Sequence, residues 1–123
     1  MGDIDMQKLF ADLAAFSEVL VNFQYELEDN YESPVLEKRL AEFRARIKEF
    51  LNYTPTFNGN SLEQSEQKYV AGQIMGDLSY SLRALEGINK DTNVFDIIDV
   101  LKDTYATLVR HLPNNDYVGG YDN

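Results

Sequence analysis

The sequence predicts an all-α fold: an antiparallel four-helix bundle over residues 1–112, followed by a flexible C-terminal tail over residues 113–123. Apolar residues recur at alternating steps of three and four in four stretches of the chain, which is the spacing of one helix face. Short linkers separate these stretches, and short links make consecutive helices antiparallel. No stretch alternates apolar and polar residues as a half-buried strand does.

The first helix is expected from Asp3 to about Asn30, because its apolar row is the longest in the chain. The row consists of Met6, Leu9, Leu13, Phe16, Leu20, Phe23 and Leu27. Phe10, Val21 and Tyr25 widen this face on one side, as in a bundle helix with two neighbours.

The second helix is expected over residues 34–53. Ser33 can cap it, and Pro34 suits the first helical position because its missing N–H costs nothing there. Its inward row is Leu36, Leu40, Phe43, Ile47 and Phe50. The helix carries five basic residues against three acidic ones. This is either a solvated face, with Glu42 paired to Arg46, or a basic patch that docks an acidic partner or a second copy of the chain.

The third helix follows the linker "TPTFNGN" and begins at Ser61, which has capping-box spacing to Gln64. Its inward row is Ala71, Ile74, Leu78, Ser81, Leu85 and Ile88, helped by Met75 and Leu82. Gly87 marks the expected end of the helix.

The fourth helix is expected from about Thr92 to Leu112, where Pro113 ends it. Its inward row is Val94, Ile98, Leu101, Tyr105, Leu108 and Leu112. The remaining polar segment, "NNDYVGGYDN", is the expected flexible tail, with Tyr117 and Tyr121 as contact points.

The sequence lacks the residues that most kinds of catalytic site require. The chain has no cysteine and one histidine, His111, with Leu108 three positions before it. This rules out a cysteine–zinc site, a thiol nucleophile and the Glu-x-x-His pairs of a di-iron bundle. Neither GxGxxG nor GxxxxGK[ST] occurs in the sequence, so a phosphate-binding glycine loop is not expected either. We expect no catalytic residue, metal ligand or cofactor, and a structural role for His111 at a helix C-terminus.

The net charge of −10 and pI of about 4.4 oppose binding to nucleic acid and to anionic membranes. The acidic N-terminus does not resemble a signal peptide, and no apolar run is long enough to span a membrane. We therefore expect a cytoplasmic protein with no direct nucleic-acid or membrane partner.

Asp96, Asp99 and Asp103 fall on the outer side of the fourth helix. They form either a solvated face or a docking surface for a basic partner. A sharper variant is mimicry of nucleic acid, in which carboxylates replace phosphates and Glu18, Glu26 and Asp29 of the first helix assist.

The stretch "YVAGQIMGDLSY" places Gly72 and Gly76 between Tyr69 and Tyr80 on the outer side of the third helix, together with Arg83. A glycine inside a helix costs about 1 kcal/mol relative to alanine. Either the 53–60 linker or the tail crosses this face, or a partner helix approaches it with the tyrosines and Arg83 as anchors, or the two glycines are merely tolerated there.

The layout of four amphipathic helices with a polar tail resembles the bacteriocin immunity proteins in outline, without motif residues that match position by position. The function we expect is that of a non-enzymatic acidic helical protein that binds and modulates, by inhibition or neutralisation, a partner protein. The alternatives are the nucleic-acid mimic and a structural subunit of a homo-oligomer, such as a dimer paired through the first helix. An enzyme would need buried polar groups, of which Ser81 is the only one expected in a core row.

Overall fold

The computed structural model describes residues 6–52 and 62–112. It contains four α-helices: α1 (Met6–Asp29), α2 (Leu36–Leu51), α3 (Leu62–Glu86) and α4 (Val94–Arg110). No strand occurs within the described ranges, so the predicted all-α, four-helix class is confirmed. The expected tail (113–123) and the capping residue Ser61 lie outside the described residues.

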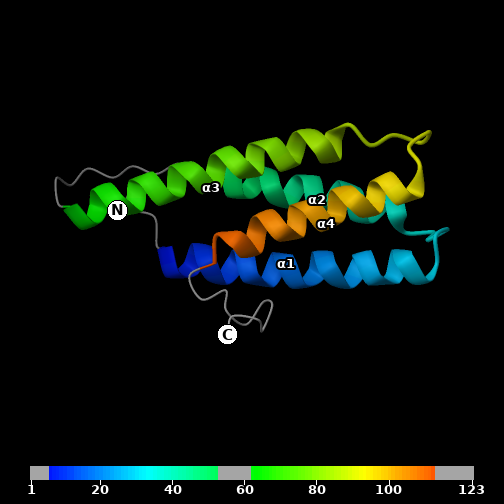
Figure 1. The fold of residues 1–123 in the computed structure, drawn as a ribbon, viewed down its shortest axis with the longest axis horizontal. Helices are drawn as coiled ribbons and strands as arrows, with labels where there is room; N and C mark the ends of the chain where they lie inside the picture. Colours follow the sequence, from blue (N-terminus) through cyan, green and yellow to red (C-terminus); the bar gives the residue numbers. More distant parts are fainter. Residues whose placement is uncertain (1–5, 53–61, 113–123) are drawn as a thin grey trace.

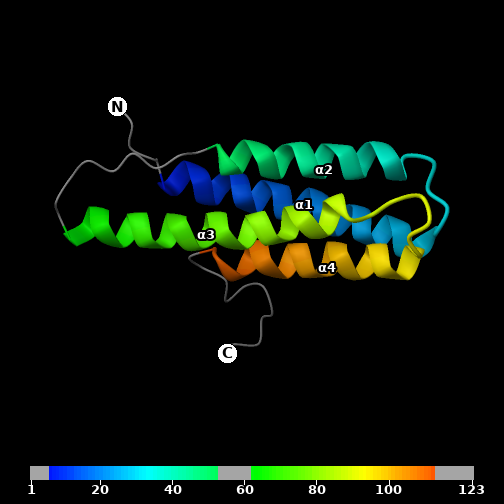
Figure 2. The same ribbon diagram turned by 90° about the horizontal axis from the view of Figure 1, so that it is seen from above.

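The helices alternate in direction, so that α1 and α3 run one way and α2 and α4 the other (Figures 1 and 2). Helix α1 packs against α4, α4 against α3, and α3 against α2. Between α1 and α2 the contact is made by phenylalanine rings: the centroid of Phe43 lies 5.8 Å from that of Phe16 and 5.8 Å from that of Phe23. The backbones of α1 and α2 approach each other less closely than those of the three packed pairs, and these rings fill the space between them.

The core is a single cluster that draws on all four helices. The predicted rows of α1, α2 and α3 are confirmed wherever the side chain is described, with Leu36, Met75, Leu82 and Ile88 half-buried at the edges. The buried apolar side chains are Leu9, Leu13, Phe16, Leu20, Phe23, Leu27, Leu40, Phe43, Ile47, Phe50, Ala71, Ile74, Leu78, Leu85, Ile97, Ile98, Leu101, Leu108, Val109 and Leu112.

The buried face of α4 is wider than predicted. Ile97 and Thr104 are buried, whereas Val94 and Tyr105, which the sequence placed in the inward row, are only half-buried. The reason is that α4 packs against α1 on one side and α3 on the other. On α1 the reverse error occurs: Tyr25, expected to widen the apolar face, is 59% exposed.

Besides Ser81, three other polar side chains are buried, contrary to the sequence-based expectation. They are Ser17, Gln24 and Thr104. Each is satisfied within its own helix. The hydroxyl of Ser17 donates to the Ala14 carbonyl over 2.7 Å, and that of Thr104 donates to the Val100 carbonyl over 2.8 Å. Such local bonds explain how these groups tolerate burial.

The helix ends differ in detail from the prediction. Helix α2 begins at Leu36, and the Ser33 hydroxyl accepts a hydrogen bond from the Val35 amide in the turn before it. Helix α4, expected from about Thr92, begins at Val94 and is capped by Asn93, whose side chain accepts from the Phe95 amide over 2.7 Å. Helix α3 ends where expected, with the Gly87 amide donating to the Arg83 carbonyl over 3.0 Å.

The N-terminal turns of α3 project beyond the ends of the other helices (Figures 1 and 2). Lys68, Tyr69 and Val70 are exposed there, and Ala71 is the first buried residue of the helix described. None of the described helices has the length and apolar character of a membrane span.

Candidate interaction surfaces

The structure brings the five predicted residues of α3 onto one exposed face, which we call the glycine–tyrosine surface (Tyr69, Gly72, Gly76, Tyr80 and Arg83). Tyr69 is 67% exposed and Tyr80 is 76% exposed. A Cβ atom built on Gly72 or Gly76 would have no neighbouring atom of the described chain within 4 Å. No described element therefore uses the space that the two glycines leave.

Gln73 was missed in the sequence analysis and belongs to this surface. Its side-chain amide donates a hydrogen bond to the Tyr69 hydroxyl over 3.0 Å, one helical turn away. The i, i+4 spacing was a usable signal for this bond. The 53–60 linker and the tail, which the sequence offered as covers for the glycines, lie outside the described residues.

Asp96, Asp99 and Asp103 are all exposed on the outer side of α4. None of their carboxylates pairs with a described cation. Arg110, the basic residue in the last turn of α4, is bound by Asp77 of α3 over 3.1 Å. The three carboxylates thus face solvent without internal compensation. Glu18, Glu26 and Asp29, the expected helpers on α1, are also exposed.

Asp77 joins α3 to the end of α4, a link between residues 34 apart that the sequence analysis missed. His111 is the C-cap residue of α4, and its Nε2 lies 2.7 Å from Asp77 Oδ2. An ionised carboxylate only accepts hydrogen bonds, so the ring nitrogen is the donor. The His111 hydrogen bond, helped by Arg110 and opposed by partial burial, lowers the pKa of Asp77 below its ordinary value of 3.8. His111 was predicted to have a structural role, and the structure shows that its specific partner is Asp77.

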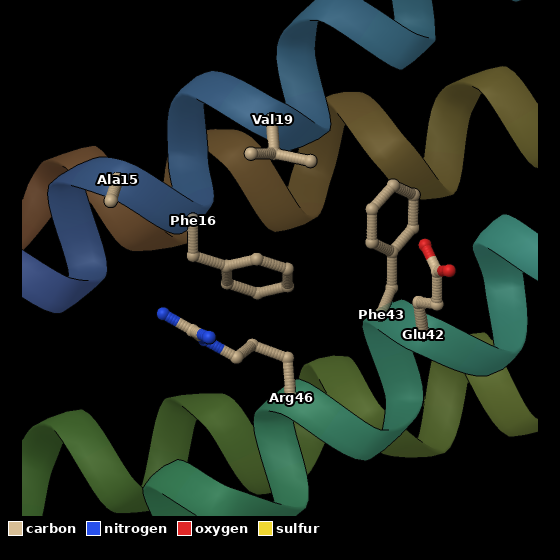
Figure 3. Close-up of a pocket in the computed structure, with 6 residues that line it drawn as sticks. All are labelled: Ala15, Phe16, Val19, Glu42, Phe43 and Arg46. Atoms are coloured by element: carbon tan, nitrogen blue, oxygen red, sulfur yellow. The ribbon is translucent and has the colours of Figure 1, made fainter.

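A groove lies along the contact between α1 and α2 (Figure 3). We call it the α1–α2 groove, and it is lined by Ala15, Phe16, Val19, Glu42, Phe43 and Arg46. The predicted Glu42–Arg46 pair does not form: Glu42 accepts from Arg39 over 2.9 Å, and the Arg46 guanidinium lies 5.5 Å from the centre of the Phe50 ring. Glu42 thus pairs with Arg39, three residues before it, while Arg46 points toward the aromatic side chains.

Within residues 6–52 and 62–112, no three acidic or histidine side chains come together as a metal site would require. Comparison with protein-family models, curated proteins and solved structures found no match.

Proposed function

We propose that this protein is a non-enzymatic binding protein, which modulates a partner protein by covering part of its surface with the glycine–tyrosine surface. The observation that carries the proposal is the open floor of α3: Gly72 and Gly76 have no described neighbour within 4 Å of a Cβ position, and exposed tyrosines stand at both ends.

The two glycines lower the stability of α3 without any compensating contact in the described chain. Two glycines inside an exposed helix face give up about 1 kcal/mol each relative to alanine. A face that only met solvent would gain nothing from this, whereas a partner helix could approach the backbone closely. Tyrosine and arginine are the side chains enriched at the centres of protein interfaces, and Tyr69, Tyr80 and Arg83 surround the floor.

Modulation by occlusion means inhibition or neutralisation of the partner, in keeping with the resemblance of the helical layout in the sequence to that of the bacteriocin immunity proteins. The net charge of −10 favours a partner with a basic surface and speeds its approach. The absence of cysteine from the sequence is the reason for placing the protein in the cytoplasm.

The test is capture of the partner by the tagged chain, followed by variants of the surface. Tyr80→Ala and Gly76→Leu are expected to weaken capture at least tenfold without loss of helix content by circular dichroism. Two substitutions on other exposed faces serve as matched controls, Tyr25→Ala on α1 and Ala41→Leu on α2, and these should retain capture. Equal capture by all four variants would reject the assignment of this surface.

Gly76→Leu also separates the two explanations of the glycine floor. If a partner uses it, the variant folds with at least the stability of the parent chain, because leucine is the better helix former. If the linker or the tail of the same chain covers it, the variant loses stability instead. The free energy of unfolding in urea decides between them.

A second candidate function is mimicry of nucleic acid by the Asp96, Asp99 and Asp103 stripe, favoured by the lack of any described cation paired with these carboxylates. Such binding would fall steeply as salt rises, whereas docking on tyrosines and backbone would persist. Capture at 50 and 500 mM salt, with an Asp99→Asn, Asp103→Asn double variant, distinguishes them. Light scattering in the same buffers detects the third possibility, a homo-oligomer.

A further inference from the structure

The packing of α1 on α2 leaves an open space above the phenylalanine rings. Phe16 and Phe43 meet edge to face, with centroids 5.8 Å apart and planes inclined at 61°. Because these rings lie between the two backbones, the more exposed side chains beside them do not meet across the helix pair. They form the two sides of an open groove. Figure 3 shows Ala15 and Val19 on the α1 side and Glu42 and Arg46 on the α2 side.

The space has the size and lining for one aromatic ring. Its volume is about 200 Å³, and an apolar cavity of about 150 Å³ is known to hold benzene. Val19, which forms one wall, is 54% exposed although it is apolar. A ring that entered here would meet Phe16 and Phe43 at distances suited to edge-to-face contact and would cover Val19.

The charges around the groove are compensated except at one position. Glu42 is neutralised by Arg39 at 2.9 Å. Arg46 pairs with no described carboxylate, and its guanidinium carbon lies 5.5 Å from the centre of the Phe50 ring. Arg46 as a residue is half-buried beside the aromatic floor, where a charge-assisted hydrogen bond to an incoming carboxylate would be stronger than in bulk water.

The groove continues beyond Arg46, which argues for an extended occupant. A second hollow of about 380 Å³ is lined by Lys8, Asp12, Arg46, Glu49 and Phe50. Arg46 lines both hollows, so a chain that placed a ring in the first could run on into the second. At that far end Lys8 is already paired with Asp12 at 2.9 Å, and Glu49 adds a negative charge, so the complementary carboxylate belongs next to the ring and not farther along.

We propose that the α1–α2 groove binds a peptide segment of a partner protein that presents an aromatic side chain beside a single carboxylate. The ring occupies the space between Val19, Phe16 and Phe43, and Arg46 binds the carboxylate. This site shares no residue with the glycine–tyrosine surface and does not depend on the function proposed for it.

The test uses the full chain labelled with ¹⁵N and the capped tetrapeptide GDFG as the probe. Titration is expected to shift the amide resonances of Ala15, Val19 and Arg46 in a saturable way. The capped peptides GNFG and GDAG, which lack the carboxylate or the ring, should each bind at least tenfold more weakly. The expected loss in Arg46→Gln is also about tenfold, the equivalent of one charge-assisted hydrogen bond.

Two further variants keep the result interpretable. Lys38→Gln removes a charge from the outer side of the same helix and should leave GDFG binding unchanged. Val19→Asp places a carboxylate at an exposed groove position and should abolish binding while the amide spectrum stays that of the folded chain.

Several results would overturn the proposal: no shift at millimolar GDFG, equal binding of GDAG, or shifts that are the same in Arg46→Gln and Lys38→Gln. Phenylacetate that bound as tightly as GDFG would show a small-molecule site instead. Groove resonances that moved with protein concentration alone would show that a second copy of the chain occupies the site.

Discussion

At the residue scale, the two glycines of α3 stand out because glycine is a poor helix former and both lie in the interior of a helix. Helix propensity disfavours Gly72 and Gly76, yet the described chain leaves the space above both empty. Gly87 is different, because it follows the last turn of α3 and its amide bonds to the carbonyls of Arg83 and Ala84. The glycines inside the helix therefore have no role in the described packing.

Gly72→Ala and Gly76→Ala are expected to stabilise the fold by about 1 kcal/mol each, because alanine costs less entropy in a helix and its methyl group meets nothing. Urea unfolding followed by circular dichroism measures the change. Gly87→Ala, outside the helix, is the control and should change stability much less. A loss of stability in either α3 variant would mean that a part of the chain outside the described ranges packs there.

The Asp77 carboxylate gives a pH-dependent prediction. Its pKa is lowered in the folded chain, so its contribution to stability is present above pH 3.8 and is lost as the pH falls through the lower folded value. Because the Asp77 side chain is 43% exposed, its contribution to the free energy of unfolding should be about 1 kcal/mol or less, as is usual for a surface ion pair.

Asp77→Asn is expected to be slightly less stable than the parent chain at pH 6, and the difference should shrink as the pH falls below 3.8 toward pH 2. The comparison of urea midpoints across this range measures the difference. A stability gap that stayed constant down to pH 2 would show that the substitution acts through packing and not through the charge.

At the element scale, α1 and α2 are held together mainly by aromatic side chains, with Phe43 touching both Phe16 and Phe23. Phe43→Ala is expected to cost about 3–5 kcal/mol, since it removes a buried ring and leaves a cavity. Tyr25→Ala, which truncates an exposed ring on α1, should stay within about 0.5 kcal/mol of the parent. Equal losses in the two variants would contradict the assigned core.

The start of α4 depends on one side chain. Asn93→Ala should cost about 1 kcal/mol, because the Phe95 amide loses its acceptor, whereas Asn93→Asp keeps a capping oxygen and should be nearly neutral. Thermal unfolding of the two variants measures this. Similar midpoints for both would indicate that the cap is dispensable.

At the scale of the whole molecule, acidic residues outnumber basic ones by ten. Self-repulsion among these charges should weaken the folded state at low ionic strength, so added salt is expected to raise the unfolding midpoint. The Asp99→Asn, Asp103→Asn double variant should show a smaller rise, because it removes two uncompensated charges of α4. Asp96 is kept because it lies in the first turn of α4, where a negative charge is favourable.

Thermal unfolding of the parent and the double variant between 10 and 500 mM sodium chloride measures this effect. Parallel salt curves would mean that the outer stripe of α4 does not contribute to the repulsion.

The amino-acid sequence alone determined the number of helices, their approximate bounds and the centre of each buried face. This was possible because a helix repeats every 3.6 residues, so the spacing of apolar residues along the chain shows which side of the helix faces the core. The same period placed the glycine–tyrosine surface and the Asp96, Asp99 and Asp103 stripe on outer faces, where the structure has them.

Only the tertiary structure decided what happens at the flanks of each face. Ser17 and Thr104 are buried while Tyr25 is exposed, because burial at a flank depends on where the neighbouring helix lies. The same holds for contacts between distant residues, such as His111 with Asp77. The α1–α2 groove likewise arises where phenylalanine rings fill the space between two helices, a spacing that periodicity along one helix does not encode.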